Sequence, residues 1–430
     1  MKNNVQNHLP TLSGNLEAIS EKYFRARNQS VKICKPLSIE DYVVQPVIDV
    51  SPPKWHLAHT TWFFENLFLK AFQPGYELFH PDYNYFFNSY YESLGERVLR
   101  PDRGNMTRPS VKDIFAFREH VDKHVEQFLN SGTEITAQML YILEIGLQHE
   151  QQHQELMLTD IKYILGHNPM FPQYHQEDTP VGVHNLPVEE KYLEVPEGVY
   201  EIGYHGDEFH YDNETGKHKV YLNGFRFLNR LITNREYLDF INAGGYQNHQ
   251  YWLSDGWEWV KSNQVNSPLY WHRQKDGWYN YKLSGLKKIA AAEPVTHVSY
   301  YEANAFANWR GKRLLSEQEW EVAAQLHVKE PARGNFVEHQ LYHPAALQGD
   351  SLQLMGDCWE WTQSAYLPYP FYRRPEGALG EYNGKFMVNQ MVLRGGSCAT
   401  PSDHIRTTYR NFFHPHLQWQ FTGIRLAEDI

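Results

Sequence analysis

The chain has 430 residues, and its 40 basic and 51 acidic residues give a net charge of -11 with no long run of one sign. This length predicts two domains, and the charge argues against a surface for nucleic acid or an anionic membrane. Three scattered cysteines, no apolar leader and no run of eighteen apolar residues lead us to expect a cytoplasmic protein that acts on small molecules.

The first part of the chain carries apolar residues at the three- and four-residue spacing of helices. Helices are expected over residues 16–27, 53–72, 110–129 and 136–165, which together predict a four-helix bundle. Residues 86–110, between the second and third helices, contain glycine, proline and four arginines with little periodicity. Such a long irregular segment is typical of a functional loop.

The amino-acid composition changes after the fourth expected helix. Residues 167–190 are rich in proline and polar residues, which predicts a linker between a helical domain over 1–166 and a second domain over 191–430. The second domain has short apolar and aromatic runs broken by Gly, Asn and Asp, with helices expected at 301–309 and 316–324. The whole chain is therefore expected to be α+β.

A group of histidines on the expected helices has the spacing of a metal site. His149 and His153 are four residues apart, so both side chains leave one mostly apolar helix face. His59 shares an apolar stripe with Phe63 and Leu67 on another helix, and metal sites in bundles use inward side chains of facing helices. Three imidazoles suit zinc, iron or copper, and buried core histidines remain the alternative.

Two neighbours of these histidines are candidates for supporting roles. His56, three residues before His59, is the competing ligand, and we expect it to support the site or to face solvent. Glu155 is expected to accept a hydrogen bond from a ligand histidine, although a solvated helix glutamate is an equal alternative.

The segments PPKWHLAHTTWFFE and HEQQHQE together resemble the DinB-like metal bundle of the ergothioneine-forming sulfoxide synthases. Later segments, including GDCWEWT and VLRGGSCATP, look like the C-type-lectin-like fold shared with formylglycine-generating enzymes. The resemblance spans nearly the whole chain. It implies a DinB-like four-helix bundle followed by a C-type-lectin-like domain.

The resemblance also implies an activity. Fe(II) on His59, His149 and His153 would use O2 to join the sulfur of cysteine to the imidazole C2 of Nα-trimethylhistidine (hercynine). The product would be hercynylcysteine sulfoxide, in ergothioneine biosynthesis. The open alternatives are a histidine- or selenium-using relative, a zinc-dependent DinB-like thiol transferase and a non-catalytic binding module.

Four residues are carried over from the family to positions near the reacting groups. Tyr90 and Tyr91 are the candidate proton donors near O2, with aromatic packing as the alternative. Gln152 and Asn411 match positions near the imidazole substrate, where amides could hold its carboxylate.

The cysteine carboxylate is assigned to Arg100 and Arg103, because guanidinium groups pair bidentately with carboxylates. Arg97 and Arg108 are possible substitutes, and solvated loop charge is the alternative for all four.

The late motif at Asn411 bears on the choice of thiol. Family members that take γ-glutamylcysteine have an acidic residue shortly after this asparagine, whereas this chain has Phe412 and Phe413, which favours free cysteine. These two residues and Trp419 could line the binding site of the trimethylammonium group and contact it by cation–π interaction. Cys398 has no second cysteine after it, so oxidation of a peptide thiol is not expected.

Overall fold

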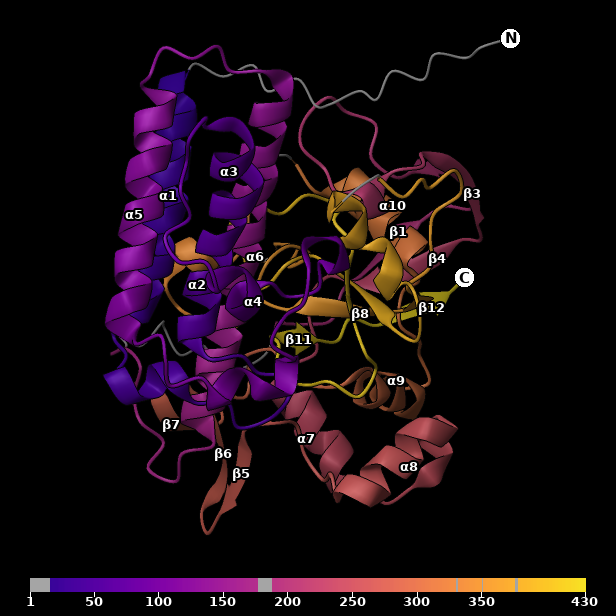
Figure 1. Cartoon of the computed structure of the whole chain (residues 1–430). Coiled ribbons are helices and arrows are strands. Elements are labelled where there is room, and N and C mark those ends of the chain that lie inside the picture. The colour runs from indigo at the N-terminus through magenta and orange to yellow at the C-terminus, as the bar shows by residue number, and fades with distance from the viewer. Residues whose placement is uncertain (1–15, 177–187, 330–331, 350, 376–377) are drawn as a thin grey trace. The chain divides into compact units, whose positions relative to one another are not determined.

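The computed structural model describes residues 16–176, 188–329, 332–349, 351–375 and 378–430 (Figure 1). It divides the chain into two compact units. The first unit comprises residues 1–164, 205–210 and 375–382, and the second comprises 165–204, 211–374 and 383–430. Residues 177–187 of the predicted linker over 167–190 lie outside the described residues. The first unit therefore includes two short segments from the part of the chain predicted to form the second domain.

The first unit is helical, as predicted. Its helices are α1 (Leu16–Cys34), α2 (Pro53–Phe63), α3 (Lys70–Phe72), α4 (Tyr83–Phe87), α5 (Val111–Leu129) and α6 (Ala137–Gly166), the last of which ends two residues into the second unit. Helices α1, α2 and α5 pack against one another, and side chains of α6 bond to α1 and α2. The long helices α1, α5 and α6 run alongside one another in Figure 1.

The second expected helix, over 53–72, is less regular than its periodicity indicates. It begins as α2 after Pro52, with Pro53 in the first turn, where the missing amide hydrogen costs nothing. A π-helical segment, η2 (Phe64–Leu69), then separates α2 from α3. The predicted loop over 86–110 contains two short 3-10 helices, η3 (Glu92–Leu94) and η4 (Arg100–Asn105).

A buried ion cluster joins three helices of this unit. The Glu150 carboxylate on α6 accepts hydrogen bonds from Arg27 of α1 at 2.8 Å, from Ser30 at 2.6 Å and from Arg118 of α5. The Arg27 Nε also donates to Asp122 at 2.7 Å. Because the two arginines and Glu150 are almost fully buried, their charges are compensated within the bundle and not by water.

The second unit combines small sheets with helices, as predicted. One sheet has the order β1-β4-β12, with β1 (Tyr192–Val195), β4 (Phe225–Leu228) and β12 (Ala427–Asp429), and another has the order β10-β9-β8-β11, with β10 (Asn411–Phe413), β9 (Met391–Arg394), β8 (Trp359–Ala365) and β11 (Thr422–Gly423). The strands β2 (Gly198–Ile202) and β3 (His218–Leu222) form a pair. The last sheet contains β5 (Trp271–Gln274), β6 (Gly277–Lys282) and β7 (Gly285–Lys288) in chain order. The pairing is antiparallel except between β8 and β11.

Four α-helices accompany these sheets, two of which were not expected. The helices are α7 (Asn234–Asn242), α8 (Ser254–Asn263), α9 (Tyr300–Trp309) and α10 (Glu317–His327). Helices α7, α9 and α10 begin with a capping box, in which a Ser or Thr hydroxyl and a Glu three residues later bind each other's backbone amides. Within the described residues, none of the helices is both long and apolar enough to cross a bilayer.

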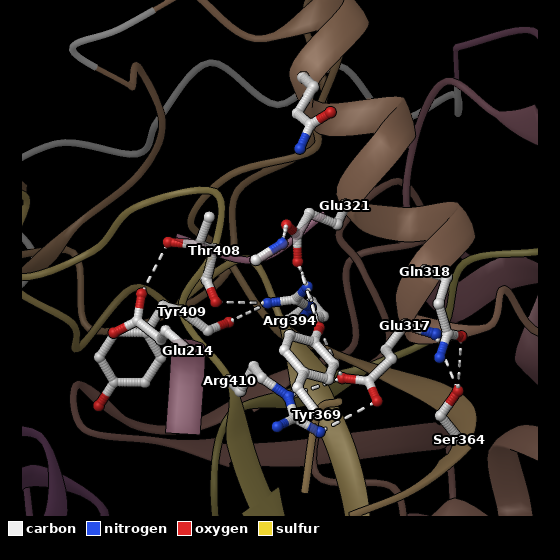
Figure 2. A network of polar contacts seen from close by, with 12 residues as sticks. Glu214, Glu317, Gln318, Glu321, Ser364, Tyr369, Arg394, Thr408, Tyr409 and Arg410 are labelled. Carbon is white, nitrogen blue, oxygen red and sulfur yellow. Dashed lines mark hydrogen bonds and ion pairs between the residues drawn. The ribbon is translucent and has the colours of Figure 1, made fainter. Parts of the chain in front are cut away.

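A buried network of ion pairs fixes the start of β10 (Figure 2). Arg410, directly before β10, pairs with Glu317 of α10 at 2.8 Å and lies 3.9 Å from the centre of the Tyr369 ring. One turn further along α10, Glu321 pairs with Arg394, whose guanidinium also donates to the backbone carbonyls of residues 408 and 409. These contacts hold the chain just before β10 against α10.

Candidate metal centre and its surroundings

Three histidines from two helices of the first unit bring their ring nitrogens together. His59 comes from α2, while His149 and His153 come from successive turns of α6. One nitrogen of each lies within 4.8 Å of the others, and all three side chains are buried. The Nε2 atoms of His59 and His149 are 3.2 Å apart. No other group of three such residues in the described parts of the chain meets this condition.

The environment keeps these imidazoles neutral. Burial lowers the pKa of His149 to about 3, against the raising effect of Glu150. Burial also lowers the pKa of His59 and His153 well below the ordinary value, and the other histidines add to this effect. A neutral imidazole keeps a lone pair, which is the form that binds a metal ion.

Hydrogen bonds decide where two of these lone pairs point. The His59 Nδ1 donates to the Phe87 carbonyl at 2.6 Å, so its Nε2 keeps the lone pair. His56 lies between Asp160 and His153, with its Nε2 2.9 Å from the Asp160 carboxylate and its Nδ1 2.8 Å from the His153 Nδ1. If His56 donates to Asp160, its Nδ1 accepts from His153, and the His153 Nε2 also keeps its lone pair.

The site therefore fits a metal ion. The two Nε2 lone pairs of His59 and His153 need a positive partner, and the buried His149 Nδ1 has no hydrogen-bond partner within the described structure. The indoles of Trp55 and Trp62 stack on His59, at ring distances of 4.6 and 5.4 Å and angles of 12° and 13°. This stacking holds the His59 ring in one orientation.

The two arginines assigned to the cysteine carboxylate differ in burial and in their hydrogen-bond partners. Arg103 is buried, lies 3.4 Å from the centre of the Trp55 ring, and donates to the hydroxyls of Ser51 and Ser89. Its Nε has no partner, and no carboxylate in the described chain forms an ion pair with it. Burial, followed by the charge of Arg100, lowers the pKa of Arg103. Arg100 is exposed and donates to the Asp49 carbonyl instead.

The candidate tyrosines form an aromatic cluster beside the histidines. The rings of Tyr90 and Tyr91 stack at 4.8 Å, and Trp62 links Tyr91 to His59. The Tyr91 hydroxyl is buried and makes no hydrogen bond of standard geometry. Burial, together with the nearby Tyr90, raises the pKa of Tyr91 well above its ordinary value, so the phenol stays protonated.

A third tyrosine, Tyr382, belongs to the same cluster. Its ring lies 5.8 Å from that of His149 and 6.2 Å from that of Tyr90, and its hydroxyl donates to the Gln152 side-chain oxygen. The neighbouring Glu381 carboxylate accepts the backbone amides of residues 92 and 93 at 2.9 and 3.1 Å. The 375–382 segment therefore contributes directly to the surroundings of the histidines.

The remaining predicted residues lie on β10 in the second unit. The Asn411 side-chain oxygen accepts the backbone amide of Phe412 at 2.9 Å. The Phe412 ring stacks on Tyr366 at 4.0 Å and 11°. The Phe413 ring lies 5.8 Å from that of Trp419. All three side chains on β10 are partly exposed, and their substrate roles stay a prediction.

Sequence reasoning identified the three histidines but missed part of their support. His56 lies in a buried chain of hydrogen bonds that ends on Asp160, a residue to which the sequence analysis gave no role. The role of Glu155 stays a prediction. Tyr382 carried no usable signal, because it lies 230 residues from Gln152 in a part of the chain assigned to the other domain.

Comparison with known proteins gives an independent view of the chain. Residues 183–334 and 340–430 match the sulfatase-modifying factor enzyme 1-like domain, and residues 23–157 match the DinB superfamily. These matches confirm the predicted fold class and the predicted resemblance.

Several curated proteins are similar to the chain. A hercynine oxygenase of Mycolicibacterium smegmatis is 29% identical over 410 residues, which cover 89% of this chain and 92% of that protein. A hercynine oxygenase of Mycobacterium tuberculosis is 34% identical over 51% of this chain and 56% of its own length. Ergothioneine biosynthesis protein 1 of Schizosaccharomyces pombe is 28% identical over 51% of this chain and 28% of its own length.

Proposed function

This chain belongs to the family defined by the sulfatase-modifying factor enzyme 1-like domain, and from that premise we propose that it is a non-haem iron sulfoxide synthase of ergothioneine biosynthesis. The substrates would be hercynine, cysteine and O2. In the balanced reaction, the S–H and imidazole C2–H bonds break and a C–S bond forms. One oxygen atom enters the sulfoxide, and the other leaves as water with the two hydrogens.

The observation that carries the proposal is the set of three buried, neutral imidazoles in a chain that resembles hercynine oxygenases over most of its length. His59, His149 and His153 would hold the metal ion. Three nitrogen ligands leave open positions in an octahedral site. Fe(II) bound there would supply redox chemistry with O2 and a common contact for thiolate and imidazole.

Arg103 is suited to bind the carboxylate of cysteine. It is a buried cation without a carboxylate partner, and it shares the Trp55 ring with His59. Such a charge is costly unless an anion pairs with it, so a carboxylate ligand gains both a charge-assisted hydrogen bond and the relief of that cost. Arg100 is exposed and is less suited to this role.

The tyrosine cluster is suited to supply a proton. The raised pKa of Tyr91 keeps its hydroxyl protonated at neutral pH, the form that can donate a proton or hydrogen bond to a bound group. Tyr382 would orient the Gln152 amide, because its hydroxyl donates to the Gln152 oxygen and the amide nitrogen is then the end that faces the substrate as a donor. The Gln152 amide would then hold the carboxylate of hercynine.

The choice of cysteine over γ-glutamylcysteine rests on the sequence at residues 411–413 and on what the family resemblance implies for it. Phe412 and Phe413 offer no charge to the amine of a γ-glutamyl group, whereas an acidic side chain would pair with it. Arg103 supplies one buried cation, which matches the single carboxylate of free cysteine.

The test is anaerobic reconstitution of the full chain with Fe(II), followed by O2 uptake with each pair of substrates and mass spectrometry of the product. The imidazoles are hercynine and histidine, and the thiols are cysteine and γ-glutamylcysteine. We expect rapid O2 uptake and a sulfoxide adduct from hercynine with cysteine. His59→Asn should abolish both, while His272→Asn, which changes a half-buried histidine of the second unit, should leave them intact.

Other outcomes separate the parts of the proposal. Product from γ-glutamylcysteine but not from cysteine would contradict the choice of thiol and leave the iron chemistry standing. No iron-dependent O2 uptake with any pair would contradict the whole proposal. Thiol transfer that requires zinc would then identify the alternative.

A further inference from the structure

A second pair of histidines lies on α5, apart from the three-histidine centre. His120 and His124 are four residues apart, and their ring centroids are 4.2 Å from each other. Residues at this spacing leave one helix face one turn apart, which allows two imidazoles to chelate one metal ion. Neither residue has a part in the proposed oxygenase chemistry.

The hydrogen bonds of this pair leave nitrogens available as ligands. The His124 Nδ1 donates to the backbone carbonyl of His120 at 2.8 Å, which leaves the lone pair on its Nε2. The His120 Nε2 is buried and has no hydrogen-bond partner among the residues described. A buried polar nitrogen without a partner is rare and indicates a bound ion or water.

The surroundings of the pair favour a cation. Tyr76 and Phe79 pack against the two imidazoles, with ring distances of 5.3 Å from Tyr76 to His124 and 5.2 Å from Phe79 to His120. Behind them, the Glu65 carboxylate accepts the Tyr76 hydroxyl at 2.9 Å and the Phe79 amide at 2.8 Å.

Electrostatics connects this carboxylate to the pair. Burial raises the pKa of Glu65, whereas the hydrogen bonds from Phe79 and Tyr76, the charge of Lys70 and, as the smallest contribution, a charge on His124 lower it. Positive charge at the pair would therefore add to the stabilisation of this carboxylate. Glu65 also lies in the π-helical segment η2, and irregular helical turns of this kind are frequent at functional sites.

We propose that His120 and His124 form a second binding site, separate from the three-histidine centre, for a divalent transition-metal ion of the Zn(II), Ni(II) or Cu(II) class. The His124 Nε2 and the His120 Nε2 supply two ligands, and water completes the coordination. The Glu65 carboxylate balances part of the ion's charge while it keeps its hydrogen bond from the Tyr76 hydroxyl. Zinc, nickel and copper fit because imidazole suits these ions better than it suits Mg(II) or Ca(II).

A metal ion at this site would stiffen one part of the first unit. It would fix two turns of α5 against the aromatic residues of the connection between α3 and α4. Since the ion binds the folded chain, its binding would raise the stability of that region.

Calorimetric titration of the full metal-free chain with Zn(II) tests the proposal. We expect the wild-type chain to bind two equivalents at micromolar concentration or tighter. The His120→Asn/His124→Asn chain should lose one equivalent and keep the other. Lys123→Ala, which changes an exposed residue of the same helix turn, should keep both.

Two further measurements make the result specific. In a His59→Asn chain, the equivalent that remains should disappear when His120→Asn and His124→Asn are added, which separates this site from the first. Hydrogen exchange of the peptide over residues 73–82 should slow with Zn(II) in the His59→Asn chain and stay unchanged in that triple variant. Equal zinc binding with and without the His120 and His124 substitutions, or binding only at millimolar zinc, would overturn the proposal.

Discussion

Replacing Glu150 by glutamine should weaken the bundle that carries the three histidines. Burial alone would raise the pKa of this carboxyl, but Arg118 and Arg27 lower it from 4.5 to about 2. By the linkage between pKa and stability, this difference corresponds to about 3 kcal/mol of stabilisation at neutral pH. Removing one partner of a buried ion pair costs about 3–5 kcal/mol, so the two magnitudes agree.

Hydrogen exchange resolved by peptide is the suitable assay, because a chain with two units does not unfold in one step. In Glu150→Gln, amides of α1, α5 and α6 should exchange on the order of a hundredfold faster than in the wild type, since 1.4 kcal/mol is about a factor of ten. Glu126→Gln, at an exposed position of α5, should change exchange by less than about 0.5 kcal/mol.

The pH dependence gives a second test of the same reasoning. A carboxyl whose folded-state pKa is lowered contributes stability above its unfolded pKa and loses it as pH falls towards the folded value. The difference between wild type and Glu150→Gln should therefore be full above pH 4.5 and shrink as the pH falls towards about 2. Exchange rates within threefold of each other at neutral pH would refute the assigned role of the cluster.

Four further changes test the site and the second unit. Arg103→Met should raise KM for cysteine by about 10- to 100-fold in O2-uptake assays, because a charge-assisted hydrogen bond is lost; an unchanged KM would remove Arg103 from the thiol site. Tyr382→Phe should raise KM for hercynine about fivefold and change kcat less, since Gln152 loses one hydrogen bond. His56→Asn should weaken Fe(II) binding about 10- to 100-fold in competition with a chelator, as expected for loss of a group that orients a ligand. Burial raises the pKa of Glu302 to about 7, so stability should fall by up to about 3 kcal/mol as pH rises from 4.5 through 7; thermal melting of Glu302→Gln should show no such slope.

Local periodicity explains why the grouping of the three histidines could be predicted. His149 and His153 lie on a regular helix, where a spacing of four residues fixes a common face whatever the tertiary structure. The helical spacing around His59 is regular because the π-helical segment begins only at Phe64, after that histidine.

The features that the local sequence pattern does not reveal depend on contacts that are distant in sequence. Arg100 and Arg103 have similar local settings, but only Arg103 finds Trp55 and buried serine hydroxyls within reach, and no spacing rule encodes that difference. Tyr382 enters the first unit from a segment that follows the strand β8, where local pattern indicates only a loop. The helices α7 and α8, of nine and ten residues, were not predicted, although the capping box of Thr233 and Glu236 marks the start of α7.

The discontinuous make-up of the first unit has a consequence for how the protein is made. A ribosome releases the helices α1 to α6 early, but the segment with Glu381 and Tyr382 emerges only after more than two hundred further residues. Until then the amides of residues 92 and 93 and the Gln152 side chain lack their partners from that segment. The nascent helical part can collapse first, but the surroundings of its histidines are completed only after residue 382 has been synthesised. An excised fragment over residues 1–166 would have the histidines without the Tyr382 side chain beside them.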